Sequence, residues 1–305
     1  MMVTHKPTQK LNGRHRKLLE LLSKKATHQP LHIPIVINKI KSLGREYTQR
    51  SRSFLYAALG ATVAHMFKLS RIRFYENGVI SFNLPVSAQV VGARATRTTH
   101  PQVINGFAKI FSTLAGKSFS VENPFLWKTK TEVINDIVKA GCADAIKFST
   151  SCTHTWEMTK LHTHCGKCSQ CIDRRFAILA AGAQEYDPAE AYGVDLLVGE
   201  RVEGEPRTMI AAYVETANEV ADITAFDFFG RYGETARVLK HLNGSADSVA
   251  LQIYELHRRH AKCITKVVDD AITQNRSAIR KRQLPESCLL RLVCDSGGIQ
   301  AGQEA

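Results

Sequence analysis

The chain has 305 residues, of which 44% are hydrophobic and 23% are charged, so it is too apolar for a disordered protein and long enough to bury a sizeable core. Its 41 Lys and Arg residues outnumber its 28 Asp and Glu residues, which gives a formal net charge of +13. The apolar segment 54–67 contains His65 and is shorter than the roughly 18 residues that a membrane helix needs. No apolar leader follows Met1, so we expect a soluble, cytoplasmic protein with no membrane partner.

Helices and strands are predicted to alternate over the first 186 residues. Apolar residues at helical spacing, together with helix-start and helix-stop signals, predict helices over 14–25, 53–69, 101–114 and 130–139. Runs rich in β-branched and aromatic residues predict strands over 31–37, 72–75 and 119–121. Because such alternation is typical of a parallel sheet covered by helices, we expect an α/β domain over residues 1–186.

After residue 186 the pattern becomes helical. Apolar residues recur every three or four positions over 209–223 and 248–279. The Gly- and Glu-rich run 199–205 is predicted to be an exposed loop. We therefore expect a C-terminal helical extension over residues 187–305.

The charge changes sign along the chain. Residues 1–60 contain 12 basic and two acidic residues, a net charge of +10, whereas residues 185–250 contain five basic and 13 acidic residues, a net charge of −8. The basic end suits phosphate on a nucleotide or a nucleic acid. A solvated amphipathic helix explains the same charges equally well.

Four of the eight cysteines lie close together in the sequence, at Cys152, Cys165, Cys168 and Cys171. Two-residue spacers let three thiolates face one ion, Gly166 permits the turn between them, and Cys152 can complete the set. Four thiolates leave no open position, so the spacing predicts a structural zinc site. The zinc loop, residues 151–175, would gain on the order of 10 kcal/mol in folding free energy from the metal.

Three other interpretations of this segment stay open. Three of the cysteines could instead hold an iron–sulfur cluster. A histidine of the same loop could replace one cysteine, the candidates being His154, His162 and His164. The thiols could also be free and buried.

The residues around the cysteines resemble the C-terminal signature of the 7-cyano-7-deazaguanine synthase family. The shared pattern is Ser151-Cys152, then Cys165-Gly166-x-Cys168-x2-Cys171-x2-Arg174 and a helix of small and apolar residues. Three upstream motifs keep the family's order: Arg50-Ser51-Arg52-Ser53 before an alanine-rich helix, Glu76-Asn77-Gly78 after a strand, and Asn123-Pro124-Phe125 before Lys130-x-Glu132. The resemblance covers roughly residues 30–186 and leaves the helical extension unexplained.

This resemblance implies a Rossmann-like fold of the adenine nucleotide alpha hydrolase type. It also implies an ATP-dependent carbon–nitrogen ligase of the queuosine pathway, which adenylates 7-carboxy-7-deazaguanine and converts it with ammonia, through an amide, to the nitrile. The implied cofactors are Zn²⁺ and ATP with Mg²⁺, and the implied partner is a deazapurine-like small molecule. Some synthase-like relatives belong to phage-defence gene sets.

The family's nucleotide loop, Ser-Gly-Gly-x-Asp-Ser, does not occur in this sequence. Ser296-Gly297-Gly298 is followed by Ile299-Gln300, so this match is accidental. We therefore expect an incomplete parallel sheet that lacks its first strand and phosphate loop, and an isolated chain that is inactive or nearly so. Three explanations of the missing loop are open. The reading frame could be truncated, a partner polypeptide could supply the loop, or the loop could have been lost. In the last case the chain is a non-catalytic zinc-containing module for a nucleotide or tRNA, or a defence-system subunit.

Candidate binding residues fall at a helix start, a strand end and a long polar loop, and no catalytic residue is assigned. Arginines at a helix N-terminus suit anions, strand ends are where parallel sheets bind ligands, and loop arginines suit a carboxylate. Each group also has a plain structural explanation as surface arginine, Asn-Gly turn or surface loop. The substrate- or nucleotide-binding candidates are Arg50, Arg52, Glu76, Asn77, Gly78, Asn83, Arg94, Arg97, Thr98, His100 and Lys130.

Overall fold

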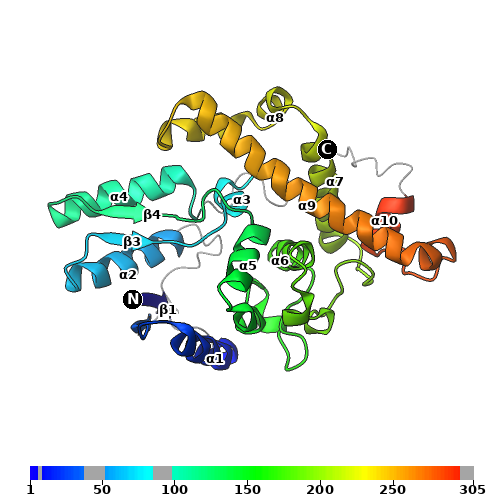
Figure 1. The fold of residues 1–305 in the computed structure, drawn as a ribbon, viewed down its shortest axis with the longest axis horizontal. Helices are drawn as coiled ribbons and strands as arrows, with labels where there is room; N and C mark the ends of the chain where they lie inside the picture. Colours follow the sequence, from blue (N-terminus) through cyan, green and yellow to red (C-terminus); the bar gives the residue numbers. More distant parts are fainter. Residues whose placement is uncertain (6–8, 38–51, 85–97, 296–305) are drawn as a thin grey trace. The chain divides into compact units, whose positions relative to one another are not determined.

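The computed structural model of the chain describes residues 1–5, 9–37, 52–84 and 98–295 (Figure 1). Its internal contacts divide the chain into two compact units. The first unit comprises residues 1–149 and 222–260, and the second comprises residues 150–221 and 261–305. Three of the binding candidates, Arg50, Arg94 and Arg97, lie outside the described residues.

This division differs from the boundary expected between residues 186 and 187. Part of the expected helical extension packs into the first unit, where Asn105 donates a hydrogen bond to the carbonyl oxygen of His241 at 2.8 Å. Asn105 and His241 lie far apart in the sequence. The change from alternating helices and strands to helices alone after residue 186 therefore does not predict this contact. The helical character expected after residue 187 is nevertheless present, in elements that are divided between the two units.

The strands form two small parallel sheets in the first unit, as the alternating pattern predicted. Strand β1 (Met2–His5) pairs with β2 (His32–Ile35), and β3 (Arg71–Arg73) pairs with β4 (Ser120–Glu122). Among the described residues these pairs belong to separate sheets.

The first unit contains the four helices predicted over 14–25, 53–69, 101–114 and 130–139, the start of the helix predicted over 248–279, and short helices that the sequence pattern did not predict. They are α1 (Gln9–Lys25), α2 (Arg52–Met66), α3 (Gly78–Phe82), α4 (Pro101–Ala115), α5 (Lys130–Lys139), a 3-10 helix (Ala143–Phe148), α8 (Ala225–Arg231), a 3-10 helix (Gly233–His241) and the first part of α9 (Ala246–Arg280). A capping box begins α5, because Thr129 and Glu132 each accept a hydrogen bond from the other's main-chain N–H.

Aromatic side chains from α4 form the centre of the first unit's core. The ring of Phe111 lies 6.1 Å from Phe107 and 5.8 Å from Phe119, and Val121 of β4 and Ala57 of α2 are buried against them. Burial of this kind contributes about 25 cal/mol per Å² of apolar surface, so it holds β4 and α2 against α4. Figure 1 shows α4 and α2 beside the β3–β4 pair.

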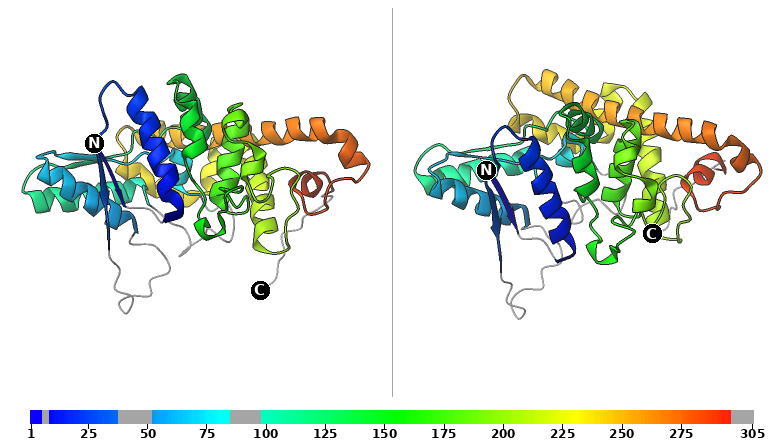
Figure 2. Two further views of the ribbon diagram at one scale, coloured as in Figure 1. Left: turned by 90° about the horizontal axis from the view of Figure 1, so that it is seen from below. Right: turned by 60° about the horizontal axis from the view of Figure 1, so that its bottom comes forward.

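The second unit is built from helices and the loop that carries the four cysteines. Its elements are α6 (Ser169–Ala180), α7 (Glu205–Asp222), the later part of α9, α10 (Leu289–Asp295) and short 3-10 helices at Thr155–Glu157, Gln184–Tyr186 and Ala189–Ala191. Helix α6 is almost wholly buried, and the ring of its Phe176 stacks on Tyr213 of α7 at 5.6 Å. In both views of Figure 2, α9 (orange) is one continuous helix. None of the helices described is both long enough and apolar enough to span a bilayer.

Candidate metal centre and strand-end cluster

The four predicted ligands converge on one point in the second unit. Cys152 and Cys165 lie in the loop before α6, Cys168 is the residue that caps this helix, and Cys171 lies in its first turn. All four sulfur atoms lie within 4.8 Å of one another, and the Sγ atoms of Cys165 and Cys171 are 3.8 Å apart. A tetrahedral ion with Zn–S bonds of ~2.3 Å requires Sγ–Sγ distances of ~3.8 Å. The set therefore fits a single tetrahedral ion, whereas an iron–sulfur cluster would spread the thiolates over several irons.

Main-chain N–H groups point at the sulfur atoms. The N–H groups of Lys167 and Cys168 each donate to Cys165 Sγ at 3.4 Å, and the N–H of Cys165 donates to Cys152 Sγ at the same distance. Gly166 makes this turn with φ of 76°, and a Cβ atom there would lie 2.1 Å from the carbonyl oxygen of Val194. Only glycine fits this position, as the sequence predicted.

The surroundings of the thiols favour thiolate at two of them even without an ion. The Cys152 thiol lowers the pKa of Cys165 to about 6, and it also lowers the pKa of Cys168. The pKa values of Cys152 and Cys171 are raised, because the neighbouring cysteines then hold the negative charge. The N-terminus of α6 adds a positive dipole end beside Cys168 and Cys171. A divalent ion would complete the deprotonation of all four.

The histidines of the loop have other contacts. The ring of His164 stacks on Tyr192 at 4.9 Å, and the ring of His154 stacks on Trp156 at 4.8 Å. His154 also lies 3.3 Å from Glu157, and these two residues with Cys165 form a second group of close donor atoms. That group uses only one of the four sulfurs, so the four-cysteine set is the more complete metal site.

A buried ion pair holds the chain after α6 beside the metal loop, which is the segment 151–175 that carries the four cysteines. Arg174 and Asp187 make two hydrogen bonds of 3.0 Å with side chains only 4% and 3% exposed, and the Tyr192 hydroxyl donates to Asp187 at 2.6 Å. Burial alone would raise the pKa of the Asp187 carboxyl, but the Arg174 guanidinium outweighs it and lowers this pKa. The Arg174 charge is therefore matched by Asp187.

A buried cation near the thiolates is Arg201, which the sequence had placed in an exposed loop. Its side chain is 3% exposed and donates to the carbonyl oxygens of Gly166 at 3.2 Å and of Asp195 and Leu196 at 3.3 Å. Burial lowers its pKa to about 10, and the negative charge of Asp195 and Cys165 opposes this fall. Because Gly166 lies between two ligands, Arg201 fixes the turn and brings a positive charge close to the thiolates. The Gly- and Glu-rich run around it gives no signal of burial.

The first unit holds a second cluster, where the adjacent strands β3 and β4 end. Asn123 donates to the carbonyl oxygen of Glu76 at 2.8 Å and to the Ser81 hydroxyl at 3.0 Å, and accepts from the Glu76 N–H at 3.2 Å. The Ser81 hydroxyl lies 2.9 Å from that of Thr99. Asn123, Ser81 and Thr99 were not among the candidates, although Asn123 stood in one of the upstream motifs.

The sequence-predicted residues of this region are built into the same cluster. Asn77 caps α3 by accepting from the Ile80 N–H at 3.2 Å, so Glu76-Asn77-Gly78 begins a helix and is more than a turn. Gly78 is buried, and a Cβ atom there would lie 1.8 Å from the carbonyl oxygen of Leu126. Asn83 ends α3 in the left-handed region with φ of 47°.

The remaining candidates lie on other elements of the first unit. His100 is buried and caps α4 by accepting from the Gln102 N–H at 3.3 Å. Thr98 is half-buried just before it, and Lys130 is the half-buried first residue of α5. Arg52 is exposed and donates to the Tyr56 hydroxyl on its own helix at 3.1 Å. The structure thus gathers the strand-end candidates and leaves Arg52 on the surface.

The segment that contains the metal centre is similar to known proteins. Residues 90–182 match the family model for the queuosine biosynthesis protein QueC. The 7-cyano-7-deazaguanine synthase of Methanocaldococcus jannaschii is 29% identical over 87 residues, which cover 28% of this chain and 37% of that enzyme. The match therefore spans little more than a third of the relative's length. No solved structure gives a significant match. The predicted resemblance is confirmed over residues 90–182, the segment that carries the four cysteines, and this segment is QueC-like.

Proposed function

We propose that the chain is the zinc-containing part of an ATP-dependent carbon–nitrogen ligase that converts a 7-deazapurine carboxylate, with ammonia, to the amide and nitrile. The observation that carries the proposal is the convergence of four thiols on one point inside the QueC-like segment. The two small parallel sheets support a Rossmann-like fold for the first unit. The name of the M. jannaschii relative supplies the reaction class.

In this proposal the zinc ion is structural. Cys152, Cys165, Cys168 and Cys171 fill its four positions, which leaves none for a substrate, and the ion fixes the loop before α6. The strand-end cluster is the proposed binding region, since ligands of open α/β sheets bind at the carboxyl ends of the strands. Its part-buried hydrogen bonds hold Glu76 and Asn77 in place, which is what a positioning site requires.

The proposed reaction needs a phosphate-binding loop that this sequence does not contain. We propose that another polypeptide supplies a Ser-Gly-Gly-x-Asp-Ser segment and that ATP and Mg²⁺ bind only in the complex. A glycine-rich loop before a helix offers main-chain N–H groups to phosphate, which side chains of the described residues do not replace.

The test is to incubate the purified chain with ATP, Mg²⁺, ammonia and 7-carboxy-7-deazaguanine, alone and with a polypeptide carrying that segment. We expect AMP and the nitrile only in the second mixture. Formation of both products at an unimpaired rate by the chain alone would contradict the need for a partner. Absence of AMP from both mixtures, with a zinc-loaded chain that binds the acid, would contradict the ligase.

A non-catalytic module that binds a nucleotide or tRNA is the second candidate function. It is favoured by the net charge of +10 over residues 1–60 together with the missing phosphate loop. Binding of tRNA through phosphate contacts should weaken steeply with salt, by about 0.9 log units in affinity per log unit of salt for each phosphate neutralised in a duplex. A salt titration of tRNA binding therefore distinguishes the two candidates without any turnover assay.

A further inference from the structure

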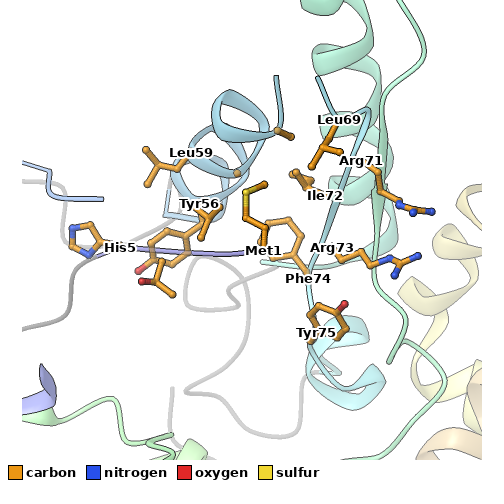
Figure 3. A pocket seen from close by; sticks show the side chains of 14 residues that line it. Met1, His5, Tyr56, Leu59, Leu69, Arg71, Ile72, Arg73, Phe74 and Tyr75 are labelled. Atoms are coloured by element: carbon orange, nitrogen blue, oxygen red, sulfur yellow. The ribbon is translucent and has the colours of Figure 1, made fainter. Parts of the chain in front are cut away.

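A groove with a volume of about 310 Å³ runs between α2 and α4 in the first unit. The two helices pack against each other, with the rings of Phe54 and Phe107 6.0 Å apart. The groove is lined from α2 by Phe54, Ala58, Ala61 and His65, and from α4 by Phe111 and Leu114. The α2 residues are spaced by four, three and four, so they share one side of the helix over about 17 Å. Tyr56 and Leu59 lie on the other side of α2, where they line a separate cavity (Figure 3).

Large apolar side chains are exposed along this groove. Leu114 is 78% exposed, and Phe54 and Leu69, which also line the groove, are about half-exposed. Met66 and Phe67, in the chain just before Leu69, are exposed as well. A contiguous apolar patch on a folded protein marks an interaction site, whereas single exposed apolar residues do not. Pockets for small ligands bury most of the ligand surface, but the walls of this groove are themselves open to solvent. The occupant should therefore be as large as a segment of polypeptide.

The charge around the groove has one sign. Residues 52–121, which supply all of its described lining, contain eight Lys and Arg residues and one acidic residue, Glu76. Lys117 lines the groove and the exposed Lys68 precedes Leu69, while none of the described lining residues is acidic. A second copy of this chain docked face to face would bring the same lysines together, and like charges across an interface disfavour it. A partner that combines apolar and acidic side chains is complementary to the groove.

We propose that the groove binds an amphipathic helix of a partner polypeptide, whose apolar side chains enter the groove and whose acidic side chains lie beside Lys68 and Lys117. A helix suits a groove that runs between two packed helices for about 17 Å, which is the length of three helical turns. The small side chains of Ala58 and Ala61 let such a helix approach α2 closely. Leu114 on the opposite wall then contacts apolar anchors at positions i, i+3 or i+4, and i+7 of the partner.

The inference does not rest on the proposed function, because the groove contains no residue of the metal centre or of the strand-end cluster. Its test therefore involves neither ATP nor metal. A failure of the ligase assay leaves it unaffected, and the reverse also holds.

The test uses the full chain and a fluorescein-labelled peptide of about 18 residues, which is long enough for partial helix formation in water. Leucine occupies one face of the peptide helix, with glutamate on both flanks of that face. A second peptide has lysine in place of every glutamate. We expect fluorescence anisotropy to show saturable binding of the acidic peptide, at least tenfold tighter than that of the basic peptide. Added NaCl should weaken it, because salt screens exposed charges.

Four variants locate the binding on the groove. Leu114→Gln removes an exposed apolar side chain without disturbing the core, and it should weaken binding of the acidic peptide about tenfold. Lys117→Gln removes one charge beside the groove, so we expect binding about two- to fivefold weaker and less dependent on salt. Leu251→Gln and Lys139→Gln are the matched controls, because they remove an exposed leucine and an exposed lysine of the first unit that do not line the groove. Both should bind like the wild type.

The proposal is overturned if the two peptides bind equally well, if the acidic peptide does not bind, or if Leu114→Gln binds it as tightly as the wild type does. Sedimentation of the wild type as a dimer and of Leu114→Gln as a monomer would also overturn it, because a second copy would then occupy the groove. Tighter binding of dodecanoate than of either peptide would assign the groove to a small amphiphile instead.

Discussion

The metal loop and the paired strands differ in how far apart in the sequence their essential residues lie. The four sulfur ligands fall within residues 152–171, and their supports, Asp187 and Arg201, follow closely in the same unit. In the sheets, by contrast, Arg73 of β3 meets Glu122 of β4, and residues of β1 and β3 line one cavity. The comparison teaches that one short segment can carry a complete set of metal ligands, whereas a sheet is assembled from strands that lie far apart in the sequence.

The largest test of this contrast is Cys168→Ala. We expect the wild type to hold one zinc ion per chain and the variant to lose it, because three thiolates no longer close the tetrahedron. Since a structural zinc contributes on the order of 10 kcal/mol to local folding, the second unit should become sensitive to protease around residues 150–180. The α2–α4–β4 core of the first unit should stay protected. Metal analysis and limited proteolysis measure the two effects.

Cys294→Ala is the matched control, because Cys294 lies in the same unit, is exposed and is not part of the cysteine set. It should keep its zinc and its resistance to protease. A Cys168→Ala variant that still holds one zinc ion per chain would refute the metal centre. Loss of protease resistance in both units of that variant would show that the first unit also depends on the metal.

The second test removes the buried ion pair beside the loop. Asp187→Asn leaves Arg174 buried without its counter-charge, which should reduce the free energy of unfolding by about 3–5 kcal/mol. The pKa of Asp187 is lowered on folding, so its contribution is present at neutral pH and is lost as the pH falls below the usual value of 3.8. The difference in stability between wild type and variant should therefore shrink in acid. Urea unfolding at pH 7 and pH 3 measures it, and a difference that is the same at both pH values would contradict the assignment.

Much of the metal loop could be predicted from the sequence because its determinants are local. Cysteine spacing and a glycine between ligands are visible in a short stretch, and so is the Thr129–Glu132 capping box at the start of α5. Arg201 could not be predicted, because its burial results from a turn of chain folding back onto Gly166. Nor could the division into units, since it depends on contacts such as that between Asn105 and His241. Many helix and strand positions were predictable, but the division of the described strands into two sheets was not.

The third test is of the strand-end cluster. Gly78→Ala places a methyl group against the Leu126 carbonyl and the Leu256 side chain, so the main chain must shift. We expect a loss of about 2–3 kcal/mol in the free energy of unfolding. Gly106→Ala is the control, because its site in α4 has no atom within 4 Å and alanine favours the helix by roughly 0.5–1 kcal/mol. Equal stability of the two variants in urea unfolding would show that the strand ends are not tightly packed.

The smallest expected effect concerns Arg201. Arg201→Met keeps most of the side-chain length but removes the charge and the hydrogen bonds to Gly166, Asp195 and Leu196. Because a zinc tetrathiolate carries a net charge of −2, we expect at least tenfold faster zinc release to a chelator, equivalent to about 1.4 kcal/mol. Arg201→Lys keeps the charge and should lie between the variant and wild type. Arg207→Met, at a half-buried position in the first turn of α7, should release zinc at the wild-type rate. If Arg201→Met also released zinc at that rate, the arginine would support only the fold of the loop. The four cysteines would then set the rate of zinc release without help from this charge.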